Sequence, residues 1–226
     1  MENKNYSLND FLRFPIKKIK TYSGLNLIYY ENCSARGEIQ SQPILNIIKK
    51  TGKEIYRHGH EWCCGHGAIG LELLHQGICE KVSLSDKFFP AVISAEFSIA
   101  LNNWQQKAQV YQIEEFSSLP EIHCDLIVAD PPSFCYDSGE NNQDGYRQTV
   151  DIGWQSHYTM FCNLHNRLTK DGDLYIYGMY SGSTPDIFEN MAKENGLTMA
   201  GCYDGDPGRY LAHFKWLKGE NDENTP

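Results

Sequence analysis

The sequence predicts an α/β fold: a Rossmann-like, doubly wound, mostly parallel sheet of seven strands, with an antiparallel C-terminal hairpin and a small N-terminal α+β extension. Strand-like and helix-like segments alternate from Glu54 onward, which favours a sheet built with right-handed crossovers. Residues 124–129 (CDLIVA) form a continuous apolar run, typical of a strand buried on both faces of a parallel sheet. The glycine-containing turn 204–208 separates the last two strand-like segments and indicates the hairpin.

The extension covers residues 1–50. We expect a short helix over 7–13, strands over 16–22 and 25–30 with Ser23-Gly24 between them, and a helix over 43–50 that begins at Pro43. This unit is too small to hold its own core, so it should pack on the main domain, residues 51–218. The polar tail 219–226 has no apolar residues with which to fold.

The main domain should run through its elements in chain order. Strands are expected over 56–63, 81–85, 109–113, 124–129, 173–180, 197–203 and 210–216, and helices over 68–75, 91–104, 151–168 and 185–195. Ligands of such sheets bind at the carboxyl ends of the strands. The long acidic loop 133–147 lies at that edge, and loops of this length are usually functional.

Composition narrows the classes of function. A net charge of −9 over 226 residues disfavours a protein that binds mainly by neutralising phosphates. No apolar run reaches the ~20 residues that span a bilayer, and the polar N-terminus has no signal-peptide core. The eight cysteines are scattered, which favours reduced thiols and a cytoplasmic location.

A strand, a glycine turn and a helix start meet in residues 60–74. Gly65, Gly67 and Gly70 have the spacing G-x-G-x-x-G, and Asp86 follows at roughly the 20 residues expected for a ribose contact. Glycine lets the backbone approach a ligand, and the helix dipole favours electronegative groups there. The pattern predicts a nucleoside-containing cofactor, and a side chain added at Gly65 or Gly67 is expected to fill the ligand's space.

Asp130-Pro131-Pro132 follows the buried strand 124–129. The two prolines fix the backbone and remove two N–H donors, which leaves carbonyl oxygens and the Asp130 carboxylate as rigid acceptors. A hydride-transfer domain has no need of these residues. Such a site instead suits an N–H group on an acceptor substrate.

With EWCCGHGAIGL followed by ADPPSF, residues 54–216 resemble the class I S-adenosylmethionine-dependent methyltransferases. Within that class the chain is similar to members with an (Asn/Asp)-Pro-Pro-(aromatic) motif, which methylate nitrogens of adenine, guanine or protein glutamine; some relatives methylate base carbons. Here Glu61 stands where Asp is more usual, and the aromatic comes one position late, because Ser133 precedes Phe134.

The resemblance implies S-adenosylmethionine as the cofactor and assigns roles by position. Glu61 would lie near the methionine amino group, Gly65 and Gly67 along the methionine moiety, and Asp86 at the ribose hydroxyls. The expected cofactor-binding residues are Glu61, Cys63, Gly65, Gly67, Asp86, Lys87, Phe88, Glu114, Glu115 and Asp130. The expected catalytic residues are Asp130, Pro131, Pro132 and Phe134.

We therefore expect a methyltransferase that N-methylates an amide or amine of a small molecule or of a protein side chain. Three alternatives stay open: an RNA or DNA base methyltransferase, an NAD-binding oxidoreductase, and a non-catalytic cofactor-binding subunit. The charge makes nucleic acid the less favoured partner, and no membrane partner is expected. His58, His60, Cys63, Cys64 and His66 suggest zinc, but they occupy a strand and its turn, without finger-like spacing, so no metal site is expected.

Overall fold

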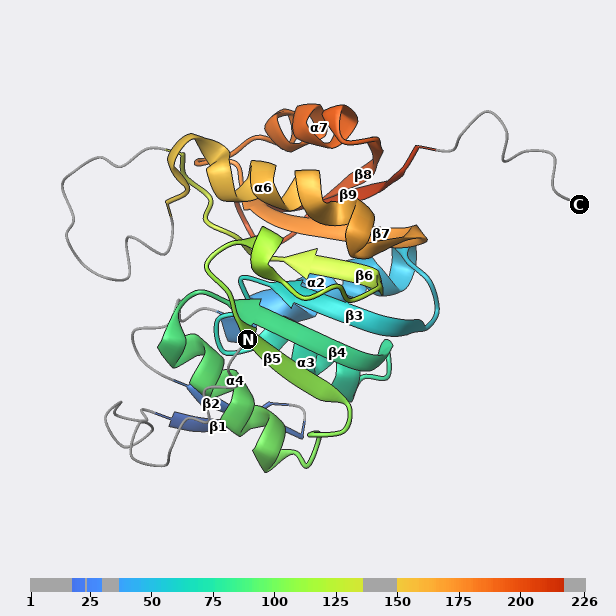
Figure 1. The fold of residues 1–226 in the computed structure, drawn as a ribbon. Coiled ribbons are helices and arrows are strands. Elements are labelled where there is room, and N and C mark those ends of the chain that lie inside the picture. Colours follow the sequence, from blue (N-terminus) through green and yellow to red (C-terminus); the bar gives the residue numbers. More distant parts are fainter. Residues whose placement is uncertain (1–17, 23, 30–36, 136–149, 218–226) are drawn as a thin grey trace, which may run out of the picture.

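The computed structural model describes residues 18–22, 24–29, 37–135 and 150–217 (Figure 1). The predicted helix over 7–13, most of the predicted loop 133–147 and the tail 219–226 lie outside the described residues. The described elements comprise a seven-stranded sheet covered by helices, and a separate two-stranded hairpin.

The large sheet has the order β5-β4-β3-β6-β7-β9-β8. Its strands are β3 (Tyr56–Trp62), β4 (Cys79–Asp86), β5 (Ala108–Gln112), β6 (Cys124–Ala129), β7 (Leu168–Met179), β8 (Leu197–Asp204) and β9 (Arg209–Trp216). The first five run parallel, and β9 pairs antiparallel with both β7 and β8. This confirms the predicted Rossmann-like sheet with its antiparallel hairpin. Strand order reverses at β3 and β6, where such sheets bind ligands.

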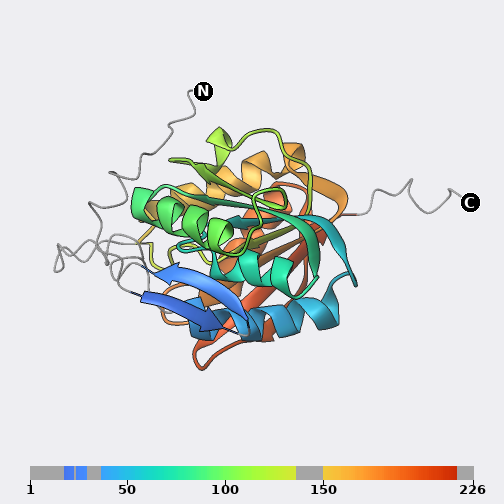
Figure 2. The same cartoon turned by 90° about the horizontal axis from the view of Figure 1, so that it is seen from below.

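Helices cover both faces of the sheet (Figures 1 and 2). On one face lie α2 (Gly37–Thr51), α3 (Ala68–His75) and α4 (Phe89–Leu101), and on the other lie α6 (Gln155–Asn163) and α7 (Pro185–Glu194), with short 3-10 turns at 116–118, 152–154 and 164–166. Each face has its own buried cluster: Leu45 and Leu71 belong to the first, Phe161 and Phe188 to the second. Because both faces are covered, the middle strand β6 is buried along its whole length.

Some predicted boundaries were wrong for local reasons. The helix expected over 151–168 starts only at Gln155, because Gly153 and Trp154 adopt left-handed backbone conformations, with φ of 62° and 58°. It ends at Asn163, and β7 begins at Leu168 rather than at residue 173. The helix expected to begin at Pro43 begins at Gly37, so this proline lies inside α2.

The N-terminal hairpin consists of β1 (Lys18–Tyr22) and β2 (Leu25–Tyr29). Polar side chains at the end of α4 and just after it bond to the free edge of β2: the Ile28 N–H donates to Ser98 Oγ (2.9 Å), and the Asn26 N–H donates to Oδ1 of Asn102, the residue after the helix (3.1 Å). Asn102 Nδ2 returns a bond to the Asn26 carbonyl at 2.7 Å. The hairpin therefore lies against α4, as Figure 2 shows.

A buried polar cluster ties the sheet together toward the amino ends of the parallel strands. Asp173, fully buried, accepts hydrogen bonds from the Tyr56 hydroxyl (2.7 Å) and His213 Nε2 (2.7 Å), and Lys215 Nζ lies 3.2 Å away. These four residues form the Asp173 cluster. Burial alone would raise the pKa of Asp173, but the hydrogen bonds from His213 and Tyr56 and the charge of Lys215 outweigh it and lower that pKa.

Two general features complete the fold. No helix within the described residues is long and apolar enough to cross a membrane. The described cysteines are all free: Cys63, Cys64, Cys79, Cys124, Cys135, Cys162 and Cys202.

Candidate active site

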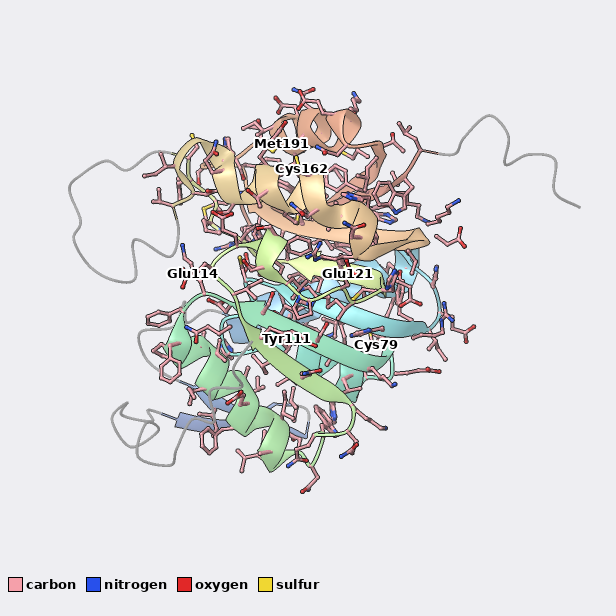
Figure 3. The ribbon with its side chains drawn as sticks, in the orientation of Figure 1. Cys79, Tyr111, Glu114, Glu121, Cys162 and Met191 are labelled. Carbon is pink, nitrogen blue, oxygen red and sulfur yellow. The ribbon has the colours of Figure 1, made fainter. Side chains whose placement is uncertain are left out.

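A pocket opens where β3 and β6 end. It is lined by Glu61, Cys63, Cys64, Gly65, His66, Ala68, Ile69 and Asp130, and its volume is about 40 Å³. Figure 3 shows Glu114, which follows β5, at the same edge of the sheet, whereas Cys79 at the start of β4 lies at the opposite edge. Because the pocket is small, a ligand the size of a nucleoside would extend from it across the neighbouring strand ends.

The turn after β3 is built from left-handed backbone. Cys63, Gly65 and Gly67 have φ of 57°, 53° and 80°, and Cys63 is one of three non-glycine residues in the described chain with positive φ. The Gly67 N–H closes the turn on the Cys64 carbonyl at 2.7 Å. A non-glycine residue in this region is strained by roughly 1–2 kcal/mol, and such strain concentrates at functional sites.

The two glycines of the turn face different surroundings. A Cβ on Gly65 would meet no atom within 4 Å, so its outer side is open space. A Cβ on Gly67 would lie 3.0 Å from Leu84 Cδ1 and 3.3 Å from Leu71 Cδ1, inside the core. The expectation that a side chain at either position fills the ligand's space therefore fits Gly65 and is wrong for Gly67.

Glu61 is buried beneath this turn. Its Oε2 accepts a hydrogen bond from the Gly70 N–H at 2.7 Å, and a Cβ on Gly70 would approach that oxygen to 2.9 Å. Gly70 thus allows the helix to start directly against the carboxyl group. Burial, together with the nearby Asp130 and Asp86 charges, raises the pKa of Glu61 to about 8.

Asp86 ends β4 and holds two loops together. Its Oδ2 accepts from the Gly65 N–H at 2.8 Å and its Oδ1 from the Phe88 N–H at 2.8 Å. Burial raises its pKa, although both backbone hydrogen bonds oppose the shift. Each carboxylate oxygen can accept a second hydrogen bond, so Asp86 keeps acceptor capacity for a ligand.

Asp130 follows β6, and about a quarter of its side chain is exposed (26%). Burial among protein atoms raises its pKa to about 6, and the Arg209 guanidinium, with Nη1 at 3.9 Å from Oδ1, opposes that shift. Arg209 lies over the Tyr177 ring, 5.3 Å from its centroid. Arg209 was not among the site residues predicted from the sequence. The signal available was the hairpin itself, because an antiparallel β9 brings the 204–208 turn to the edge where the parallel strands end.

The rest of the Asp-Pro-Pro segment is fixed by packing. Pro131 and Ser133 are buried, and Pro132 and Phe134 are half-buried. The Phe134 ring lies against Gly182, where an added Cβ would come within 2.8 Å of it. The Asp151 N–H donates to the Phe134 carbonyl at 2.7 Å. Phe134 is therefore held against the loop after β7.

The remaining predicted cofactor residues do not line the pocket. Lys87, Glu114 and Glu115 are exposed, whereas Phe88 is half-buried against a small cluster with Ile93. Glu61, Cys63, Gly65 and Asp130 line the pocket together, and Asp86 joins them through its bond to Gly65. The structure thus gathers the acids of three strand ends at one point.

His60 has a structural role. Its Nδ1 lies 2.8 Å from Ser83 Oγ and its Nε2 lies 3.0 Å from Ser85 Oγ, so both ring nitrogens are occupied. Burial lowers its pKa to about 3. The described part of the chain has no group of three His, Cys, Asp or Glu side chains placed to hold a metal ion.

Glu61, Asp86 and Asp130, here called the site carboxyls, fit a cationic ligand with hydroxyl groups. Their raised pKa values show that nearby positive charge does not offset their burial. The open side of Gly65 leaves room for a ligand to pass the turn. S-adenosylmethionine carries a sulfonium, an ammonium and a ribose diol, and so matches these groups.

Residues 38–194 of the chain match the sequence model of the methyltransferase small domain family. The chain belongs to this family. It is an S-adenosylmethionine-dependent methyltransferase, which sets aside the NAD-binding oxidoreductase that the glycine spacing alone left open. A search of curated proteins returned no match.

Solved structures of methyltransferases share the fold. The ribosomal protein L11 methylase of Lactobacillus delbrueckii subsp. bulgaricus is 14% identical, with a TM-score of 0.60 and 80% of each chain covered. An O-methyltransferase from a Brevibacillus brevis trans-AT PKS multienzyme, in complex with S-adenosyl-L-homocysteine, is 12% identical (TM-score 0.60, covering 81% of this chain and 74% of that one). The B. subtilis M1A22 tRNA methyltransferase TrmK is 8% identical (TM-score 0.57, covering 77% and 65%).

Proposed function

We propose that this methyltransferase transfers its methyl group to a nitrogen, an amide or amine of a small molecule or of a protein side chain. The observation that carries the proposal is Asp130: a mostly buried carboxyl directly after β6, followed by two prolines and lining the pocket. A fixed acceptor at this point suits a substrate that presents an N–H group. The proposal extends the Asp-Pro-Pro resemblance to the chemistry of this chain.

In this proposal the chain's residues bind, orient and accept a proton. Glu61 would face the methionine ammonium, Asp86 would accept from the ribose hydroxyls, and Gly65 would leave room for the ligand. S-adenosylmethionine supplies a methyl group on a sulfonium, which needs no metal. Asp130 accepts a hydrogen bond from the acceptor N–H, turns the nitrogen lone pair toward the methyl group and takes the proton afterward. Positioning and electrostatics supply most of the rate.

The proposal differs from its main alternative, a nucleobase methyltransferase, in the molecule that accepts the methyl group. Relatives of this fold are named for a ribosomal protein and for a tRNA as well as for O-methylation. The net charge of −9 favours a protein or small molecule, because nucleic-acid binding draws on phosphate neutralisation. We further infer that the chain acts in the cytoplasm, which the seven free cysteines of the described part support.

Two Asp130 variants test the proposal. Asp130→Ala should lower turnover by ~10²-fold or more, the usual effect of one positioned acid-base group, and leave S-adenosylmethionine affinity nearly intact. Asp130→Asn keeps a carbonyl acceptor but loses the charge. It should retain activity if the group only orients the N–H and lose it if the group takes the proton. Asp171→Ala, an exposed aspartate at the far end of β7, is the control.

The measurement is transfer of a radiolabelled methyl group into fractions of protein, RNA and small molecules, followed by mass spectrometry of the product. A methyl group on nitrogen in the protein or small-molecule fraction supports the proposal. A methyl group on carbon, oxygen or sulfur, or wild-type turnover by the Asp130→Ala enzyme, contradicts it. Labelled RNA would instead support the nucleobase alternative.

A further inference from the structure

Arg209 stands beside the Asp-Pro-Pro segment although it lies about 80 residues further along the chain. It is the first residue of β9 and pairs with Met179, the last residue of β7. The Gly205 N–H donates to the Arg209 carbonyl at 3.0 Å, and the Arg209 N–H donates to the Asp206 carbonyl at 2.8 Å. The backbone of Arg209 is thus fixed at the edge of the sheet where Asp130 lies.

The guanidinium of Arg209 is held from two sides. Nη1 lies 3.9 Å from Asp130 Oδ1, and the guanidinium carbon lies 5.3 Å from the Tyr177 ring centroid. Tyr177 is buried, and its hydroxyl donates to Asp206 Oδ2 at 3.2 Å. Because Gly205 lacks a side chain, its backbone packs directly on this ring. A planar cation on an aromatic face keeps a fixed orientation.

We propose that Arg209 is a positioning residue for Asp130: held over the Tyr177 ring, it keeps the Asp130 carboxylate ionised and directed toward the acceptor. This rests on the proposed function, in which Asp130 receives a proton from the acceptor nitrogen. A carboxyl group that already carries a proton cannot take another one. Arg209 therefore sets the pH range in which Asp130 can act.

The groups that face Asp130 support this role. Within the described part of the chain they include Glu61 on β3, the Cys63 thiol, the Tyr177 hydroxyl on β7 and Arg209 on β9. Burial raises the pKa of Glu61, of the Cys63 thiol and of the Tyr177 hydroxyl, so all three are mainly neutral at pH 7. Arg209 is thus the one of these groups that carries a full positive charge. With it in place the pKa of Asp130 is about 6, low enough for ionisation at pH 7.

The test follows the Asp130 carboxyl directly, without an acceptor substrate. In protein labelled with ¹³C at the aspartate carboxyl carbons, the Asp130 signal is assigned by its loss in Asp130→Asn and titrated by NMR. In Arg209→Gln the midpoint should rise by about 1–3 pH units, the range for removing an adjacent arginine. Arg209→Lys keeps the charge and should stay closer to wild type.

Arg57→Gln is the matched control. Arg57 Nε lies 3.9 Å from Asp125 Oδ2, the same separation as in the Arg209 pair, but at the opposite edge of the sheet. It should leave the Asp130 midpoint unchanged. A folded Arg209→Gln protein whose Asp130 midpoint equals the wild-type value would overturn the inference. If Arg209→Gln does not fold, Arg209→Lys decides: a midpoint within the range of the control supports a charge effect, and a rise as large as that expected for Gln contradicts it.

This titration separates the inference from the proposed function. If the Asp130 titration midpoint in Arg209→Gln equals the wild-type value, Arg209 does not have the proposed role. Asp130→Ala can still show loss of turnover in that case, which would support the proposed function. A wild-type turnover in Asp130→Ala removes the proposed role of Asp130, while the carboxyl titration still reports whether Arg209 holds it ionised.

Discussion

Two regions of this molecule bury carboxyl groups, and the pKa of these groups is shifted in opposite directions in the two regions. In the Asp173 cluster, Tyr56 and His213 bond to the carboxylate directly and Lys215 lies within 3.2 Å, so its pKa is lowered. At the carboxyl ends of the strands, Glu61 accepts hydrogen bonds from backbone N–H groups and, among the described residues, from no side chain of positive charge, and Asp130 faces a guanidinium at 3.9 Å. Burial raises their pKa values to about 8 and about 6. Both regions belong to the same seven-stranded sheet.

The difference separates a structural carboxylate from a binding carboxylate. A buried charge with a full set of donors stabilises the fold and leaves nothing for a ligand to supply. A buried carboxyl without sufficient positive charge weakens the unligated fold, and that deficit can be filled by a cationic ligand. Glu61 and Asp86 therefore form a preorganised receptor for the charges of S-adenosylmethionine, and Asp130 beside them faces the acceptor.

The strongest test of this comparison is Asp173→Asn, set against Asp130→Asn. Asp173→Asn removes the charge that faces Lys215 and replaces one of the two acceptor oxygens with an NH2 group, so that Tyr56, His213 and Lys215 share a single acceptor. It should cost about 3–5 kcal/mol of unfolding free energy at pH 7. Because the pKa of Asp173 is lowered, its contribution is present above the unfolded-state pKa and is lost as the pH falls through the folded value. The cost should therefore shrink in acid. Asp130→Asn should not destabilise the unligated protein at pH 7.

Urea unfolding at pH 7 and at about pH 3, below the unfolded-state aspartate pKa of about 3.9, measures both variants. Equal destabilisation by the two substitutions at pH 7 would show that the two regions do not differ in the way described.

A smaller effect is expected from Asp86→Ala. It removes an acceptor for the ribose hydroxyls, and it also frees the Gly65 and Phe88 N–H groups that Asp86 holds. S-adenosylmethionine binding should weaken by about 1.5–3 kcal/mol, the scale of a hydrogen bond to a charged group. Titration calorimetry gives the affinity, and Asp171→Ala again serves as the control. Unchanged affinity would remove Asp86 from the site.

The two glycines of the turn should differ in a smaller way, in whether a substitution affects stability or cofactor binding. Gly67→Ala forces a methyl group against Leu84 and Leu71 at φ 80°, so it should lower stability by roughly 1–2 kcal/mol. Gly65→Ala enters open space and costs only the backbone strain at φ 53°, about 1 kcal/mol, but should weaken cofactor binding. Thermal unfolding and calorimetry on both variants separate the two effects. If Gly67→Ala weakens binding more than Gly65→Ala does, the two faces of the turn have been assigned the wrong way round.

The fold and part of the site could be predicted from the sequence because both depend on local patterns. The apolar run 124–129, the glycine spacing and the acid at Asp86 are each recognised from a few neighbouring residues. The strands next to these patterns are parallel, so their carboxyl ends lie together at one edge of the sheet. Arg209 could not be found in this way, since its approach to Asp130 depends on the antiparallel register of β9 against β7. The late start of α6 was equally hidden, because Gly153 and Trp154 take left-handed conformations that composition does not fix.

Proton release on cofactor binding tests the central claim most directly. With a pKa of about 8, Glu61 is mostly protonated at pH 7, and a bound cation should drive it to the carboxylate. Calorimetric titration of S-adenosylmethionine at pH 7, repeated in buffers of different ionisation enthalpy such as phosphate and Tris, counts the protons exchanged. We predict release of close to one proton by the wild type (~0.9 from a pKa near 8) and almost none by Glu61→Gln. Identical binding enthalpies in both buffers, or equal release by wild type and Glu61→Gln, would contradict the claim that the buried Glu61 carboxyl receives the positive charge of the cofactor.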